Sequence, residues 1–134
     1  MRLSSALYYA IIGITQIAAH DSPRPLSCPG LCKEFGHSTK FMSLVLKQMT
    51  QAGLIVSTRG TTGGYKLAKP ADEISLLEII EAIDGPLDSG DVRGAGFDRD
   101  AIAVVEGTLA GVVGDARKRL AAVTLADLRA AKAA

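Results

Sequence analysis

The sequence has no tryptophan, and aromatic residues make up only 4% of its 134 residues. Any core must therefore consist mainly of aliphatic side chains. The two cysteines are too few for a disulfide framework and fit a reducing compartment. No run of about 20 apolar residues is present, so a membrane-spanning helix is excluded. Gln16 and two tyrosines interrupt the apolar stretch that follows Arg2, which makes it a poor signal peptide, so we expect a cytoplasmic protein.

Acidic residues are almost missing from the first half of the chain. Residues 1–70 contain eight Lys or Arg and two Asp or Glu, whereas residues 71–134 contain seven and twelve. The two halves therefore carry charges of +6 and −5, which the formal net charge of +1 conceals. This asymmetry predicts that the first half meets a polyanion and that the second half does not.

Ten residues from Thr58 to Leu67, with the sequence TRGTTGGYKL, combine three glycines with two cations. This stretch is not a nucleotide-binding P-loop, because that motif requires a lysine directly after its last glycine and then a helix. Here Tyr65 follows Gly64, and Pro70 stops the segment soon afterwards. A β-branched run precedes the glycines at residues 55–58, and a second short β-type run with an aromatic residue follows them at residues 65–67. Together they predict a β-hairpin with a basic tip.

Three helices are predicted before this hairpin. An apolar repeat predicts the first over residues 3–20, and Ser27 and Ser38 are placed to cap the second and third, which end near residues 35 and 52. The last two, joined by about three residues that include a glycine, are typical of a helix-turn-helix. We expect the third helix to bury four positions: Phe41, Val45 (or Leu44), Met49 and Ala52. Its exposed side offers hydroxyls and cations for base edges and phosphates, namely Thr39, Lys40, Ser43 and Lys47.

A helix-turn-helix followed at once by a hairpin is the winged-helix arrangement, in which Arg59 at the hairpin tip would enter a groove of DNA. After the hairpin, Ser75 and Glu78 form a capping box for a helix over residues 76–83, and residues 87–97 are expected to be a loop.

A long helix is predicted from about residue 98, and Thr124 is placed to cap a last short one. The long helix has an apolar stripe with a nearly heptad spacing that should meet another helix, formed by Ile102, Val105, Leu109, Val112, Ala116 and Leu120. Gly107, Gly111 and Gly114 interrupt this helix and either weaken it locally or allow two backbones to approach closely.

Taken together, the glycine-rich wing and the EISLLEIIEAIDGPL segment at residues 73–87 resemble the Rrf2 family of bacterial winged-helix regulators. Its members include an iron–sulfur cluster regulator, a nitric-oxide-sensing repressor and a cysteine-metabolism repressor. The resemblance implies a mainly α fold with a small β-hairpin: a winged helix-turn-helix domain over residues 1–86, then a loop and dimerisation helices over residues 87–134.

The resemblance also implies a homodimer on double-stranded DNA, with the recognition helix in the major groove and the wing in the minor groove. The residues expected at DNA are Arg2, Ser4, Ser27, Ser38, Thr39, Lys40, Ser43, Lys47, Arg59, Gly60, Gly63 and Gly64. Leu44 departs from the polar residue often found at its position. The residues expected at the dimer interface are Ile102, Val105, Leu109, Val112 and Ala116.

Cluster-binding members of the family place three cysteines in the loop after the DGPL turn, and this loop has none between residues 87 and 97. We therefore expect no iron–sulfur cluster and no other cofactor. Cys28 and Cys32, four residues apart on one helix face, either pack as small hydrophobic residues or form a two-thiol redox or metal site.

No catalytic arrangement stands out in the sequence, so we do not expect an enzyme. The interpretation is a sequence-specific DNA-binding regulator, acting as a repressor. An alternative is a protein-interaction module whose acidic C-terminal half docks a partner enzyme, with weak DNA binding. The two differ in one feature: Lys40, Lys47, Arg59 and Lys66 should converge on one face if DNA is the partner.

Overall fold

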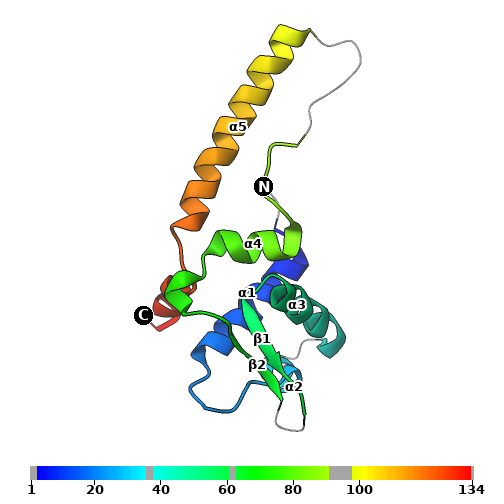
Figure 1. Cartoon of the computed structure of the whole chain (residues 1–134), viewed down its shortest axis with the longest axis vertical. Coiled ribbons are helices and arrows are strands. Elements are labelled where there is room, and N and C mark those ends of the chain that lie inside the picture. The colour runs from blue at the N-terminus through cyan, green and yellow to red at the C-terminus, as the bar shows by residue number, and fades with distance from the viewer. Residues whose placement is uncertain (1–2, 36–37, 61–62, 91–97, 134) are drawn as a thin grey trace.

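The computed structural model describes residues 3–35, 38–60, 63–90 and 98–133. Figure 1 shows a body from which the long helix α5 stands out, with α6 returning to its side. The elements in chain order are α1 (Ser5–Ala19), α2 (Cys28–Phe35), α3 (Thr39–Gln51), β1 (Ile55–Thr58), β2 (Gly64–Leu67), the 3₁₀ turn η1 (Ala71–Glu73), α4 (Leu76–Asp84), α5 (Arg99–Ala121) and α6 (Leu125–Ala133). The predicted mainly helical fold with one hairpin is confirmed.

The core of the body is aliphatic, as the lack of tryptophan requires. Leu7 and Ile14 of α1, Leu46 of α3 and Ile79 of α4 are completely buried and belong to one cluster. No polar or charged side chain is buried in the part of the chain that the structure describes. Over the same residues, no helix is both long and apolar enough to cross a membrane.

The helices form where they are predicted, but two buried faces differ from the prediction. In α3 the buried residues are Met42, Val45, Leu46 and Met49, whereas Ala52 is exposed. The helix packs against both α1 and α4, whereas Ala52 is its C-cap residue, where the helix ends and the chain turns toward β1. Leu3 lies before α1 and is exposed rather than part of its buried face.

The start of α4 carries the predicted capping box. The Ser75 hydroxyl accepts a hydrogen bond from the Glu78 N–H at 3.1 Å, and Glu78 Oε2 accepts one from the Ser75 N–H at 2.8 Å. Lys69 Nζ lies 2.6 Å from Glu78 Oε1. Burial raises the pKa of the Glu78 carboxyl, but Lys69 and the donors of Ser75 outweigh it, so the net pKa is lowered from 4.5.

The C-terminal segment returns to the body and joins its core. Leu76 N–H donates to the Val123 carbonyl, and Leu125 N–H donates to the Ile74 carbonyl, both at 2.8 Å. The Leu125 side chain is completely buried in the core cluster. Thr124 caps α6 as predicted, because its hydroxyl accepts from the Asp127 N–H at 3.2 Å. The end of α5 is therefore held against the segment that leads into α4.

The capping box makes a pH-dependent contribution to stability that Glu78→Gln should remove. Because folding lowers the pKa of Glu78, this contribution is complete above the ordinary value of 4.5 and is lost as the pH falls through the lower folded value. We expect the variant to unfold at lower temperature than the wild type near about pH 7, and the difference to shrink towards about pH 3.

Thermal unfolding followed by circular dichroism checks this expectation. Glu73→Gln, which changes an exposed carboxylate of η1, is the matched control and should give a pH profile parallel to that of the wild type. If the difference in unfolding temperature between Glu78→Gln and the wild type does not change with pH, the Glu78 carboxylate does not make the pH-dependent contribution assigned to it.

Candidate nucleic-acid interface

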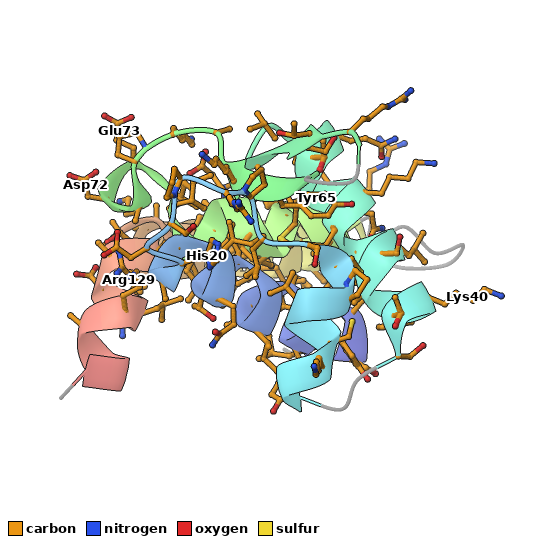
Figure 2. The ribbon with its side chains drawn as sticks, turned by 90° about the horizontal axis from the view of Figure 1, so that it is seen from below. His20, Lys40, Tyr65, Asp72, Glu73 and Arg129 are labelled. Carbon is orange, nitrogen blue, oxygen red and sulfur yellow. The ribbon has the colours of Figure 1, made fainter. Side chains whose placement is uncertain are left out.

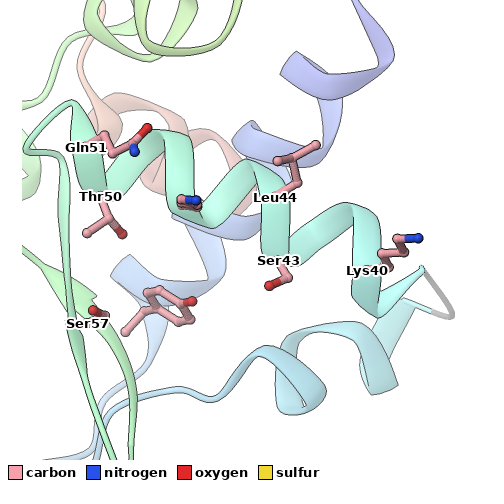
Figure 3. A pocket seen from close by; sticks show the side chains of 8 residues that line it. Lys40, Ser43, Leu44, Thr50, Gln51 and Ser57 are labelled. Atoms are coloured by element: carbon pink, nitrogen blue, oxygen red, sulfur yellow. The ribbon is translucent and has the colours of Figure 1, made fainter.

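The outward side of α3 faces a groove of about 550 Å³ that lies between this helix and the hairpin. Lys40, Ser43 and Lys47 line it from α3, and all three are exposed. Figure 3 looks onto the groove and shows Ser43 pointing toward the hairpin, with Thr50 and Ser57 on either side of the gap. The exposed hydroxyl-and-cation side that the sequence predicts for this helix is therefore present, and the hairpin forms its other wall.

A second groove, of about 480 Å³, lies between the hairpin and the start of α2. Arg59 and Gly60 line it from the hairpin tip, and Ser27 lines it from the position just before α2. Ser57 and Tyr65 line both grooves. These two residues are cross-strand partners, since β1 and β2 pair antiparallel with Ser57 opposite Tyr65. The outward face of α3, the hairpin and the start of α2 thus form one continuous surface.

The hairpin is held in this position by backbone contacts rather than by its tip. Leu26 and Tyr65 exchange two backbone hydrogen bonds, of 3.1 and 2.9 Å, which add a short extended segment beside β2. A Cβ at Gly64 would lie 2.6 Å from the Leu26 carbonyl carbon, so glycine is required there. Gly64 is buried, and its role is to let the hairpin approach Leu26, whereas Gly60 has a φ of +112° that suits the tip.

The charges on this surface are of one sign. Lys40, Lys47 and Arg59 line the two grooves, and within the described ranges no Asp or Glu does. Figure 2 shows Lys40 and Tyr65 well separated from the acidic pair Asp72 and Glu73, which lie near α6. The three cations therefore surround hydroxyl groups on a face free of lining carboxylates.

Lys66 does not join the other three cations, contrary to the prediction. Its neighbour Tyr65 faces the grooves, so alternation along β2 turns Lys66 to the other side of the hairpin. There its Nζ donates to the Pro23 carbonyl at 2.7 Å. Lys66 thus ties the hairpin to the loop between α1 and α2.

The three serines predicted at helix starts, Ser4, Ser27 and Ser38, all cap their helices, but Ser4 also has a neighbouring carboxylate. Ser27 accepts from the Gly30 N–H at 3.1 Å, and Ser38 accepts from the Phe41 N–H at 3.4 Å. Ser4 caps α1, and its hydroxyl also donates to Asp84 Oδ1 at 2.6 Å. Because the Asp84 carboxylate at that position repels phosphate, we do not propose that Ser4 contacts DNA. Arg2 lies outside the described residues.

Five residues of the first groove were not predicted as site residues: Leu44, Thr50, Gln51, Ser57 and Tyr65. Thr50 and Gln51 follow Lys47 by three and four positions, so helical spacing alone places them on the same side. Ser57 and Tyr65 become visible only once the strand register is known. Burial and then the nearby Cys28 raise the pKa of Tyr65 above 10.0, so its phenol remains a hydrogen-bond donor at neutral pH.

The two cysteines sit in different environments on α2. Cys32 is buried in the core, and Cys28 is partly buried, with its Sγ donating to the Thr39 carbonyl at 3.7 Å. Burial, followed by the charge and hydrogen bond of Cys32, raises the pKa of Cys28 to about 11. Cys32 belongs to the core cluster and Cys28 packs against it, so these positions favour the packing interpretation. No group of three or more His, Cys, Asp or Glu is placed to hold a metal ion within the described segments.

The predicted apolar stripe of α5 is exposed along most of its length. Val105, Leu109 and Val112 are 42%, 36% and 60% exposed, and no residue of α5 is buried. Figure 1 shows that this part of α5 stands clear of the body. At 100° per residue, Gly107 and Gly114 fall on the side of the helix opposite this stripe. The glycines therefore do not bring backbones together at the stripe.

The fold and this surface define a winged helix-turn-helix protein. A family model described as "Rrf2: Iron-dependent Transcriptional regulator" matches residues 3–131, so the chain belongs to the Rrf2 family. The resemblance inferred from the wing and the α4 segment is thereby confirmed.

Named relatives and solved structures agree with this assignment. The chain is 32% identical over 94 residues to the HTH-type transcriptional regulator IscR of Photorhabdus laumondii, covering 70% of this chain and 57% of that protein. It is 29% identical over 96 residues to IscR of Vibrio campbellii, again over 57% of that protein. The chain thus spans little more than half the length of these curated relatives. They are transcriptional regulators and not enzymes.

Among solved structures, CymR, the global cysteine regulator of B. subtilis, superposes with a TM-score of 0.77 at 22% identity, covering 97% of both chains. IscR of T. potens superposes with a TM-score of 0.70 at 25% identity, covering 96% of this chain and 85% of that one. The winged-helix fold with its long C-terminal helix is therefore shared across the family.

The iron dependence in the family description does not fit the donor atoms of this chain. An iron–sulfur cluster is held mainly by cysteine thiolates. The chain has two cysteines, of which Cys32 is buried in the core and Cys28 packs against the core. The loop at residues 87–97, where cluster-binding members were expected to carry cysteines, contains no cysteine in the sequence, and its residues 91–97 lie outside the described residues.

We expect the purified protein to stay colourless after anaerobic incubation with ferrous iron and sulfide followed by desalting, because each chain offers only two thiols and that of Cys32 is buried in the core. Visible absorption and iron analysis measure the result. The Cys28→Ser/Cys32→Ser double variant is the control and should give the same spectrum. A stoichiometric brown chromophore that the double variant lacks would overturn the conclusion.

Proposed function

We propose that this protein is a sequence-specific DNA-binding regulator. The observation that carries the proposal is the continuous surface of α3 and the hairpin, where Lys40, Lys47 and Arg59 surround hydroxyl groups without a lining carboxylate. Cations supply affinity for phosphates, and hydroxyl and amide groups can read base edges. The proposal includes a cytoplasmic location and action as a repressor that occupies its operator.

The arrangement of the surface suggests how it meets the duplex. The exposed side of α3 suits the major groove, which admits a helix, and there Thr39, Ser43 and Gln51 would approach base edges. The hairpin projects beside α3 and would place Arg59 at the neighbouring minor groove, where a narrow A·T-rich groove attracts arginine. Ser27 and Ser38, at the starts of α2 and α3, would lie near phosphates.

We also propose that the protein acts as a homodimer through α5. Val105, Leu109 and Val112 form an exposed aliphatic stripe on a helix that its own body does not cover. Ile102 and Ala116 extend the stripe at its two ends, and both are partly exposed. Packing this stripe against the same stripe of a second chain would remove its apolar surface from water, which favours association of the two chains.

The DNA-binding proposal is tested by selection from random duplexes. The protein should enrich a palindromic sequence and protect it in footprinting, and its affinity should fall steeply as the salt concentration rises. A protein that binds no duplex at low salt would contradict the proposal. Transcription in vitro from a promoter that contains the selected site should decrease when the protein is added.

Arg59→Ala should weaken binding to the selected operator by about 1–3 kcal/mol, the range for a good specific contact. It should weaken binding to a scrambled duplex by less, because a minor-groove arginine reads shape as well as charge. Titrations of both duplexes at several salt concentrations measure the two losses. Equal losses on both, with the salt slope lowered by roughly one, would instead indicate a phosphate contact.

Lys66→Gln is the matched control for Arg59→Ala. It removes one positive charge from the same hairpin but on the side away from the grooves, and it keeps an N–H donor for the Pro23 carbonyl. We expect it to change operator affinity much less than Arg59→Ala does. A loss as large as that of Arg59→Ala would mean that only the net charge of the hairpin matters.

The dimer is tested with the double variant Val105→Asp/Leu109→Asp, which should sediment as a monomer because two carboxylates cannot be buried in an aliphatic seam. Ala103→Asp/Ala110→Asp adds the same charge on the opposite side of α5 and should sediment as a dimer. An unchanged dimer mass in the first variant would exclude the stripe as the interface.

A further inference from the structure

Leu44 is a large aliphatic side chain in the middle of the polar side of α3. It is 55% exposed, whereas Met42, Val45 and Leu46 beside it are fully buried. It follows Lys40 by four residues and precedes Lys47 by three, so it lies between two cations on one side of the helix. It lines the same groove as they do.

The fold does not use this side chain. Leu44 is neither in the hydrophobic core nor among the partly buried residues packed against it. Figure 3 shows it on the side of α3 away from the hairpin, beyond Ser43. An apolar group flanked by ammonium groups does not suit an apolar protein partner, because burying the interface would also strip water from both cations.

A duplex satisfies both kinds of group at once. Its phosphates lie along the rims of the major groove, where lysines can reach them, and the floor between them carries one apolar group, the C5-methyl of thymine. If Lys40 and Lys47 contact the phosphates, α3 places Leu44 and Ser43 next to the base edges on the floor of the major groove.

We propose that Leu44 contacts the C5-methyl group of a thymine in each half-site and thereby sets a preference for thymine at that position. The inference rests on the proposed DNA-binding function and adds a base-specific contact to it. The hydroxyl of Ser43 would approach the adjoining base edge, and the lysines would fix the helix in register on the backbone.

Deoxyuridine tests this contact, because it differs from thymidine only by the absence of that methyl group. Each thymine of the selected operator is replaced in turn, in one half-site, and affinity is measured for the wild type and for Leu44→Ala. At one position the wild type should lose about fourfold in affinity, the value for one buried methyl-sized group. Leu44→Ala should bind the thymine operator more weakly and show no difference between thymine and uracil there.

Two further variants sharpen the result. Val56→Ala trims another exposed aliphatic residue, paired with Lys66 on the hairpin, and should keep the full response to uracil. Leu44→Gln should shift the selected base at that position toward adenine, because the amide can pair with adenine N6 and N7. Circular dichroism should show that both Leu44 variants fold like the wild type.

The proposal is overturned if no uracil substitution affects the wild type, or if Leu44→Ala responds to uracil as strongly as the wild type does. Sedimentation of Leu44→Ala as a monomer would also overturn it, since Leu44 would then be a contact between two protein chains. Failure of the wild type to select any duplex is a separate result, which removes the DNA-binding function itself.

Discussion

The two backbone hydrogen bonds between Leu26 and Tyr65 are the contact on which the proposed interface depends. They fix the hairpin against the segment that leads into α2, and Gly64 makes the approach possible. The tip with Arg59 is thereby positioned relative to Lys40 and Lys47, which come from a different part of the chain. A hairpin attached only through its own two strands would be free to tilt, because a two-stranded sheet is marginally stable by itself.

A second set of contacts joins this body to α5. Arg117 Nη1 lies 2.6 Å from Glu81 Oε1 and donates to the Leu87 carbonyl at 3.1 Å, and Leu125 is buried in the core just beyond the helix. The C-terminal part of α5 is therefore anchored to α4, whereas its N-terminal turns stand free. In the proposed dimer, this anchoring would set the distance between two recognition helices and hence the spacing of half-sites.

Most of what the sequence predicted correctly depends on short-range interactions. Ser38, Ser75 with Glu78, and Thr124 cap helices through bonds that span three residues, so their spacing is visible in the sequence. The exposed side of α3 followed from the same spacing. The site residues of the hairpin were harder to predict. Which face of the hairpin a side chain lies on depends on the strand register, and which face is exposed depends on the segments that cover the hairpin.

The errors arise where a helix ends or where distant segments meet. Ala52 was expected in the core, but it is the C-cap residue of α3, where the chain leaves the helix toward β1. Lys66 was expected on one face with the other three cations if DNA is the partner, but the Pro23 carbonyl, 43 residues earlier, holds its ammonium group. Gly64 was expected at DNA, but a Cβ there would collide with the Leu26 backbone, so its role is to let the hairpin pack against Leu26.

The position of the cations on α3 and the hairpin also affects the rate of DNA binding. Lys40 lies away from α6, where Arg129 accompanies the acidic pair Asp72 and Glu73 (Figure 2), so the cations of the proposed interface form a positive end with no carboxylate among the described residues that line its grooves. In the field of a polyanion such a molecule experiences a torque as well as an attraction, and it turns its positive end forward before contact. A larger share of collisions would then begin in the productive orientation, and this advantage would fade as the Debye length shortens with added salt.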